Sequence, residues 1–146
     1  MPSDRAPAPS RIEGRATWLI SRAYARSQGL LHEGMADGAD GLRNQHYRLL
    51  AALEEWGPVV QADLGRSTGT DRSDVVALLT ELEGRGLIRR APDPANLRRK
   101  IVSITEPGIR QLEALDAVID QIQERVLAPL SAAERRQLTA LLAKLA

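Results

Sequence analysis

The sequence predicts a mainly α-helical protein: a winged helix-turn-helix with a two-stranded β-hairpin wing and long terminal dimerisation helices. Three observations support this prediction. Apolar residues recur at three- and four-residue steps near both ends of the chain, as in long amphipathic helices. Two short helical patterns flank Thr68-Gly69-Thr70, which is the spacing of a helix-turn-helix. Behind them, two short β-type runs enclose a turn rich in proline.

The composition indicates one globular domain and excludes several chemistries. The 146 residues are 43% hydrophobic and 27% charged, which is ordinary for a soluble protein. The absence of cysteine excludes disulfides, thiolate zinc sites and thiol nucleophiles. No apolar run approaches the ~20 residues of a membrane span, and the first residues lack the hydrophobic region of a secretion signal. We therefore expect a cytoplasmic protein that is not an enzyme and has no membrane partner.

The net charge of +1 hides an uneven distribution. Counted in blocks, residues 1–30 carry +3, residues 31–64 carry −4, residues 65–100 carry +3 and residues 101–146 carry −1. A basic surface is therefore compatible with a nearly neutral chain, and such a surface attracts polyanions. The alternative is that the arginines are scattered over solvated helix faces.

The N-terminal half is expected to consist of a tail and two helices. Residues 1–10 are rich in Pro, Ala and Ser and predict a disordered tail, followed by a single domain over 11–146. An apolar stripe predicts a dimerisation helix over about 11–35, which the glycines between Gly34 and Gly41 should end. A second helix is expected from about Leu42 to Trp56, where Gly57-Pro58 stops it.

The winged helix-turn-helix is expected over about residues 42–105. Its two short helices are predicted over 61–67 and 71–85, with Gly86 in the left-handed position that follows a helix. Strands are expected at 87–90 and 100–104, with residues 92–96 as the turn between them.

The C-terminal helices are expected over about 106–146. Thr105 is a candidate N-cap for the first, Pro129 ends it, and Ser131 with Glu134 forms a capping box for the last. The apolar stripes of the terminal helices are too long for so small a central module to cover. We therefore expect a homodimer, the alternative being that these helices pack only on their own chain.

The second helix of the helix-turn-helix is expected to read DNA bases in the major groove. Arg72 is the best candidate for guanine, because its guanidinium can donate two hydrogen bonds to O6 and N7. Ser73 can donate to a phosphate or a base, and Val76 can touch a thymine methyl or simply pack. Asp74 can accept from cytosine N4, although stabilisation of the helix dipole is the expected role. On the hairpin, Arg98 is placed to enter a minor groove, with Arg99 and Lys100 left for phosphates.

Catalytic and metal-binding patterns are incomplete. His32-Glu33 begins an HExxH motif, but position 36 is alanine, so the second ligand is missing. Residues 37–41 lack the alternating ligands of a calcium loop. His46 has no evident partner in the sequence and is expected to be structural or to line a pocket. No metal site and no cofactor are predicted.

With these elements in place, the chain resembles the MarR family of bacterial transcriptional regulators, most closely over about Leu42 to Leu112. The telling stretches are Leu-Glu-Gly-Arg-Gly-Leu-Ile-Arg-Arg over 82–90 and Arg98 followed, after five intervening residues, by Ile-Thr-Glu-Pro-Gly over 104–108. The resemblance implies a homodimer that binds a pseudo-palindromic operator on double-stranded DNA, usually as a repressor. It also implies release by a small aromatic or phenolic ligand, a wing arginine at Arg98, and base contacts at Arg72 and Ser73.

Three departures from the family pattern are visible. Asn96 stands where the wing signature normally has an acid two residues before the arginine, so an amide replaces the carboxylate that would orient Arg98. The recognition helix has Asp74, Val76 and Ala77 where the family commonly has polar or basic residues. The absence of cysteine excludes the peroxide-sensing branch of the family.

The ligand pocket is predicted from the few ring-bearing residues, Trp18, Tyr24, His46 and Tyr47, of which some must be ordinary core. Two functions remain open. The first is a sequence-specific dimeric repressor that a ligand releases. The alternative is a winged-helix module that binds a ligand or protein and has weakened DNA binding, for which Asp74 and the apolar residues of the recognition helix argue.

Overall fold

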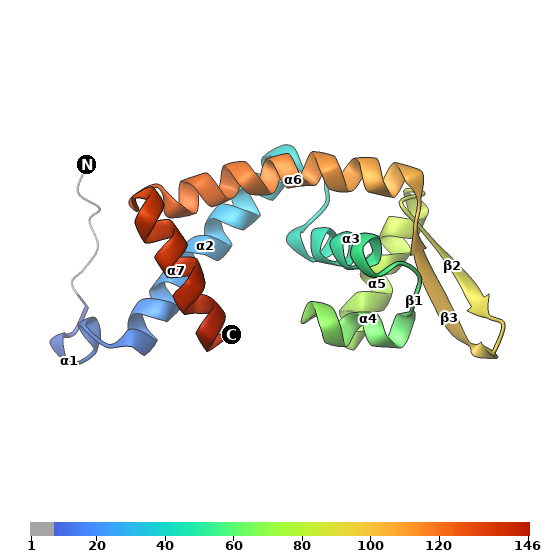
Figure 1. Ribbon diagram of the computed structural model, residues 1–146, viewed down its shortest axis with the longest axis horizontal. Coiled ribbons are helices and arrows are strands. Elements are labelled where there is room, and N and C mark those ends of the chain that lie inside the picture. Colours follow the sequence, from blue (N-terminus) through green and yellow to red (C-terminus); the bar gives the residue numbers. More distant parts are fainter. Residues whose placement is uncertain (1–7) are drawn as a thin grey trace.

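The computed structural model describes residues 8–146, and its helices and strands follow the predicted order (Figure 1). The helices are α1 (Ser10–Glu13), α2 (Ala16–Gly38), α3 (Asn44–Trp56), α4 (Gln61–Thr68), α5 (Arg72–Gly84), α6 (Glu106–Leu127) and α7 (Ala132–Leu145). The strands are β1 (Val59–Val60), β2 (Ile88–Asp93) and β3 (Asn96–Ile104). The tail predicted over 1–10 falls mostly outside the described residues, and Ser10 already belongs to α1.

The two long helices α2 and α6 run side by side, while α3, α4, α5 and the strands form a module at the far end of α6 from α7 (Figure 1). Ion pairing between Arg125 and Glu33 at 3.3 Å joins the long helices. The guanidinium of Arg26 donates to the last carbonyls of α6, those of Val126 at 2.6 Å and Arg125 at 3.0 Å. These contacts hold α2 against the C-terminal part of α6.

The helix ends within the predicted segment from Gly34 to Gly41, but at Gly38 rather than near residue 35. A Cβ at Gly34 would overlap the side chain of Ile122, and one at Gly38 would lie 3.3 Å from Val118. These glycines therefore let α6 approach closely rather than break the helix. The chain turns only afterwards, at Asp40 and Gly41, both with positive φ.

The core of the module is built from leucines on three helices and valine on the sheet. The fully buried side chains with the largest volumes include Leu49, Leu50, Leu53, Leu64, Leu79, Leu82 and Val102. On α5 the buried positions repeat every three or four residues, so the opposite side of this helix faces solvent.

The sheet has three strands in the order β1-β3-β2, one more than the predicted hairpin. The additional strand, Val59–Val60, pairs with Val102 and Ile101, and two residues are too few to show a periodic pattern. The hairpin, which we call the wing, is also longer than predicted. Its strands take in Pro92, Asp93 and Asn96, and proline is tolerated because β2 is an edge strand.

The predicted caps of the C-terminal helices are confirmed. The Thr105 hydroxyl accepts from the Gly108 N–H at 3.2 Å and donates to the Gly86 carbonyl at 2.7 Å, and Gly86 has the predicted positive φ. Ser131 and Glu134 form the capping box of α7. Across residues 8–146, none of the helices combines the length and the apolar character that a membrane crossing requires.

Candidate nucleic-acid interface

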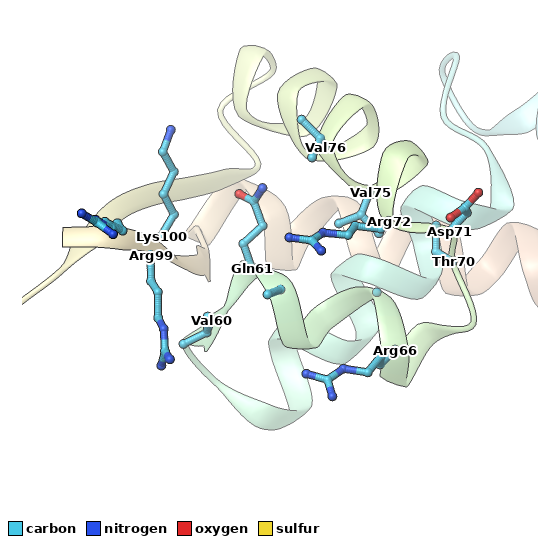
Figure 2. Close-up of a pocket in the computed structure, with 13 residues that line it drawn as sticks. Val60, Gln61, Arg66, Thr70, Asp71, Arg72, Val75, Val76, Arg99 and Lys100 are labelled. Atoms are coloured by element: carbon cyan, nitrogen blue, oxygen red, sulfur yellow. The ribbon is translucent and has the colours of Figure 1, made fainter. Parts of the chain in front are cut away.

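A concave surface of about 730 Å³ lies between the start of α5, helix α4 and the wing (Figure 2). It is lined by Val60, Gln61, Ala62, Gly65, Arg66, Thr70, Asp71, Arg72, Val75, Val76, Arg98, Arg99 and Lys100. Five of these side chains are cationic and one is a carboxylate, so the formal charge of the lining is +4. In Figure 2 the guanidinium groups of Arg66 and Arg72 extend toward the wing, whereas Asp71 lies at the opposite side. The surface therefore offers cations from three elements to one partner.

The turn between α4 and α5 sets the direction of Arg72. Gly69 ends α4 in the left-handed conformation, with φ 66°. A Cβ at Gly65 would lie 3.1 Å from Val75, so the two helices cross in close contact. With Val75 packed inward, Arg72 and Val76 project together on the exposed side, one helical turn apart.

The wing presents its three cations on two faces. Successive side chains of a strand alternate, so Arg98 and Lys100 belong to the face of buried Val102. Lys100 and Arg99 point to opposite sides of β3 (Figure 2). The Asn96 amide oxygen accepts from the backbone N–H of Arg98 at 3.1 Å. The amide thus holds the backbone of the wing, and among residues 8–146 the Arg98 guanidinium makes no hydrogen bond or ion pair.

Arg90 joins the wing to the recognition helix α5. Its guanidinium, with a side chain only 12% exposed, donates to Glu83 at 3.0 Å and to the Thr80 hydroxyl at 3.3 Å. The backbone N–H of Arg90 donates to the other Glu83 oxygen at 3.1 Å. The hydrogen bond from Arg90 lowers the pKa of Glu83, so the pair stays ionised. The Arg90 guanidinium is therefore occupied by contacts within the chain, although in the sequence it stands among the basic residues of the wing.

Five of the seven predicted DNA-contacting residues line the concave surface: Arg72, Val76, Arg98, Arg99 and Lys100. Ser73 and Asp74 are exposed on α5 but do not line it, and Asp74 lies in the first turn, where its charge suits the helix dipole. Sequence reasoning missed Gln61 and Arg66. The basic block over 65–100 includes Arg66, but no pattern in the sequence places α4 beside the wing.

His46 has partners that the sequence does not reveal, and they give it the structural role that is one of its two expected roles. It is fully buried, and its Nδ1 accepts from the backbone N–H of Arg43 at 2.9 Å. This fixes the proton on Nε2, which donates to the Glu81 carboxylate on α5 at 2.7 Å. A second proton on the ring would place two N–H donors against each other, so the fold requires neutral His46.

We expect stability to depend on pH through His46. Burial lowers the pKa of this imidazole from its ordinary value of 6.5 and outweighs the opposing effect of Glu81. Between pH 6.5 and the lower pKa of the folded state, the His46 ring is protonated in the unfolded chain and neutral in the folded chain. The free energy of unfolding should therefore fall as the pH drops below this value, and the loss should stop at the folded pKa.

Urea unfolding at about pH 7.5 and about pH 5.5 measures this effect. The matched control is His46→Gln, which keeps hydrogen-bonding capacity without a titratable ring. Equal pH dependence in both proteins would contradict the assignment.

None of the four predicted pocket residues lines the concave surface beside the wing. A second cavity of about 500 Å³ is lined by Gln28, Leu31, His32, Met35, Ala36, Gly41, Leu42, Arg43, Asn44 and Gln45, and includes none of them. Tyr24 is 64% exposed on α2, where Trp18 also lies. The Tyr47 hydroxyl donates to Asp116 on α6 at 2.7 Å, and burial together with this hydrogen bond raises the pKa of Tyr47 to about 12. Tyr47 and His46 thus connect elements within the chain.

Comparison with known proteins identifies the family. The family model described as MarR family matches residues 40–99, which include α3, α4, α5 and most of the wing. The HTH-type transcriptional repressor NicR of Pseudomonas putida is 32% identical over 127 residues, which are 87% of this chain and 79% of that protein.

Solved structures share the whole arrangement. A probable transcriptional regulator from Pseudomonas aeruginosa is 35% identical, with a TM-score of 0.80 over 93% of this chain and 100% of that one. Bordetella bronchiseptica BpsR, whose DNA binding is regulated by 6-hydroxynicotinic acid, is 26% identical, with a TM-score of 0.81 over 94% and 97% of the two chains. The chain belongs to the MarR family of winged-helix, DNA-binding transcriptional regulators.

Proposed function

We propose that this chain is a dimeric repressor that binds a pseudo-palindromic DNA operator and releases it when a small aromatic carboxylate binds. The observation that carries the proposal is the concave surface between α5 and the wing, with its five cations and single carboxylate. A helix with exposed Arg72 fits the major groove, and a strand hairpin with Arg98 fits the adjacent minor groove. Arg66, Arg99 and Lys100 are then left for phosphates.

Exposed apolar side chains on the terminal helices support a homodimer. They lie on α2 and α7 and comprise Leu19, Ile20, Tyr24, Leu141, Leu142 and Leu145. Such a patch is costly in water and is covered economically by a second copy with the same patch. In this proposal α2, α6 and α7 form the dimer, and residues 42–105 form the DNA-reading part of a single domain over 11–146.

The cavity beside α2 supports a ligand of defined chemistry. Its volume of about 500 Å³ suits a small molecule, and its lining combines apolar Leu31 and Met35 with the cation Arg43. This combination favours an aromatic ring that carries a carboxylate. BpsR, whose DNA binding is regulated by 6-hydroxynicotinic acid, supports this choice of ligand, and NicR, which is named as a repressor, supports the repressor role.

We expect purified protein to select a pseudo-palindromic sequence from fragments of the source genome. Fluorescence anisotropy should give a dissociation constant at least about 1000-fold lower for this sequence than for random duplex. Three phosphate-facing cations per protomer predict a slope of about −5 in a plot of log affinity against log salt concentration for a dimer.

Equal affinity for selected and random duplex would contradict the repressor function. Failure to bind heparin or random DNA even at low salt would instead favour the alternative of an interaction module. The exposed Asp74 and the half-exposed Val76 of α5 are the features that fit this alternative.

A further inference from the structure

The segment from Asp40 to His46 contacts both the ligand cavity and the recognition helix. Residues 41–45 line the cavity. The same segment makes three polar contacts with the C-terminal part of α5 and its cap. The Asp40 carbonyl accepts from Arg85 at 2.6 Å, Arg43 pairs with Glu81 at 3.4 Å, and His46 donates to Glu81 at 2.7 Å. A displacement of this segment is therefore expected to shift α5, the helix that presents Arg72.

Arg43 is the residue common to the two sites. Its guanidinium meets Glu81 through one long contact, and both side chains are about half exposed, at 57% and 49%. Such a pair is weak, because water screens it. A carboxylate inside the cavity can accept two parallel hydrogen bonds from a guanidinium, which makes a stronger pair. A ligand carboxylate in the cavity can therefore displace Glu81 as the partner of the Arg43 guanidinium.

When Glu81 loses its contact with the Arg43 guanidinium, its other contact, the hydrogen bond from His46, is affected as well. The Nδ1 of His46 accepts from the backbone N–H of Arg43, and the Nε2 of the same ring holds Glu81. If Arg43 turns toward the cavity and its backbone shifts, the hydrogen bond that fixes the His46 ring is disturbed as well. One residue therefore supports both donors of the Glu81 carboxylate.

We propose that a carboxylate ligand and the recognition helix compete for Arg43, so that binding in the cavity releases Glu81 and loosens α5 from the rest of the module. Arg43, His46 and Glu81 act as positioning residues in this coupling. The inference rests on the proposed function of a ligand-released repressor and adds the route between the two sites. Because the coupling is reciprocal, operator binding weakens ligand binding by the same factor.

The test compares operator affinity with and without 6-hydroxynicotinate, using the neutral amide of the same ring as a control compound. In the wild type the carboxylate should weaken operator binding by about tenfold, and the amide should have no effect. In Glu81→Gln, which keeps a hydrogen bond to His46, the carboxylate should bind the free protein about threefold more tightly. Its effect on the operator should shrink by about the same factor.

Variants of Arg43 complete the test. Arg43→Gln should bind the operator more weakly than the wild type, because α5 has lost the same contact, and its affinity should not change with the carboxylate; the double variant should behave like Arg43→Gln alone. Arg43→Lys, which keeps the charge but not the fork, should give an intermediate response. Matched controls are Arg48→Gln and Glu54→Gln on the exposed side of α3, and urea unfolding checks that each variant is folded.

Each outcome separates the inference from the proposed function. If Glu81→Gln keeps the full response while Arg43→Gln loses it, Arg43 only contacts the ligand and the inference is wrong. If wild-type operator binding is unchanged by the carboxylate, the inference is also wrong, although operator binding stands. If the wild type has no operator at all, the proposed function itself fails.

Discussion

Replacing Gly108 by alanine is expected to lower the free energy of unfolding by about 3 kcal/mol. Gly108 lies in the first turn of α6, against the backbone that enters β2. A Cβ at this position would overlap the Leu87 carbonyl oxygen and lie 2.7 Å from the Ile104 side chain. That oxygen cannot move freely, because it accepts from the Thr105 N–H at 3.1 Å. The methyl group of an alanine at position 108 can therefore be accommodated only if α6 moves away from the sheet.

Urea unfolding followed by circular dichroism measures the loss. The matched control is Gly84→Ala near the end of α5, where a Cβ would meet no atom within 4 Å. There the substitution should raise the free energy of unfolding by about 0.5–1 kcal/mol, because alanine has less backbone conformational entropy than glycine in the unfolded chain. Similar stabilities for the two variants would contradict the close approach of α6 and the sheet.

The Arg72→Ala variant is expected to lose about 2–6 kcal/mol of operator binding free energy, from two half-sites at about 1–3 kcal/mol each. Arg72 is exposed at the start of α5 and faces the concave surface, where its guanidinium can donate to one base. The variant should also tolerate substitutions at one base pair of each half-site, because the group that distinguishes this base pair is gone. Anisotropy titrations against a set of single-base operator variants measure both effects.

Arg99→Ala is the matched control, since it removes a guanidinium that points to the other face of β3. It should weaken binding to all sequences alike and reduce the salt slope by about 2 in a dimer. If Arg72→Ala instead weakens all sequences alike, Arg72 contacts phosphate rather than a base.

The sequence predicts most of the fold because the periodicity of apolar residues and the capping residues are local signals. Thr105, Ser131 and Gly86 mark element boundaries that the structure confirms. Gly34 shows where local signals fail. A glycine in a helix indicates either a break or a close approach, and only the position of Ile122 on another helix decides between them.

The candidate site was predicted less completely, for the same reason. An exposed cation and a cation used within the fold look alike in the sequence. Arg98 and Arg90 are eight positions apart in one hairpin, yet Arg98 is exposed and Arg90 is paired with Glu83. His46 and Glu81 are 35 residues apart, so no spacing rule connects them. Only the packing of α3 against α5 brings their side chains together.

The junction between Arg90 and Glu83 has a consequence for the operator. It fixes β2 to α5 through a side chain that is nearly buried, so the base of the wing is held against the recognition helix. An inserted base pair lengthens duplex DNA by about 3.4 Å and rotates all the base pairs beyond it about the duplex axis. If the chain binds an operator as proposed, we expect the half-site to have a fixed length, with no base pair added between the positions that face the helix and those that face the wing.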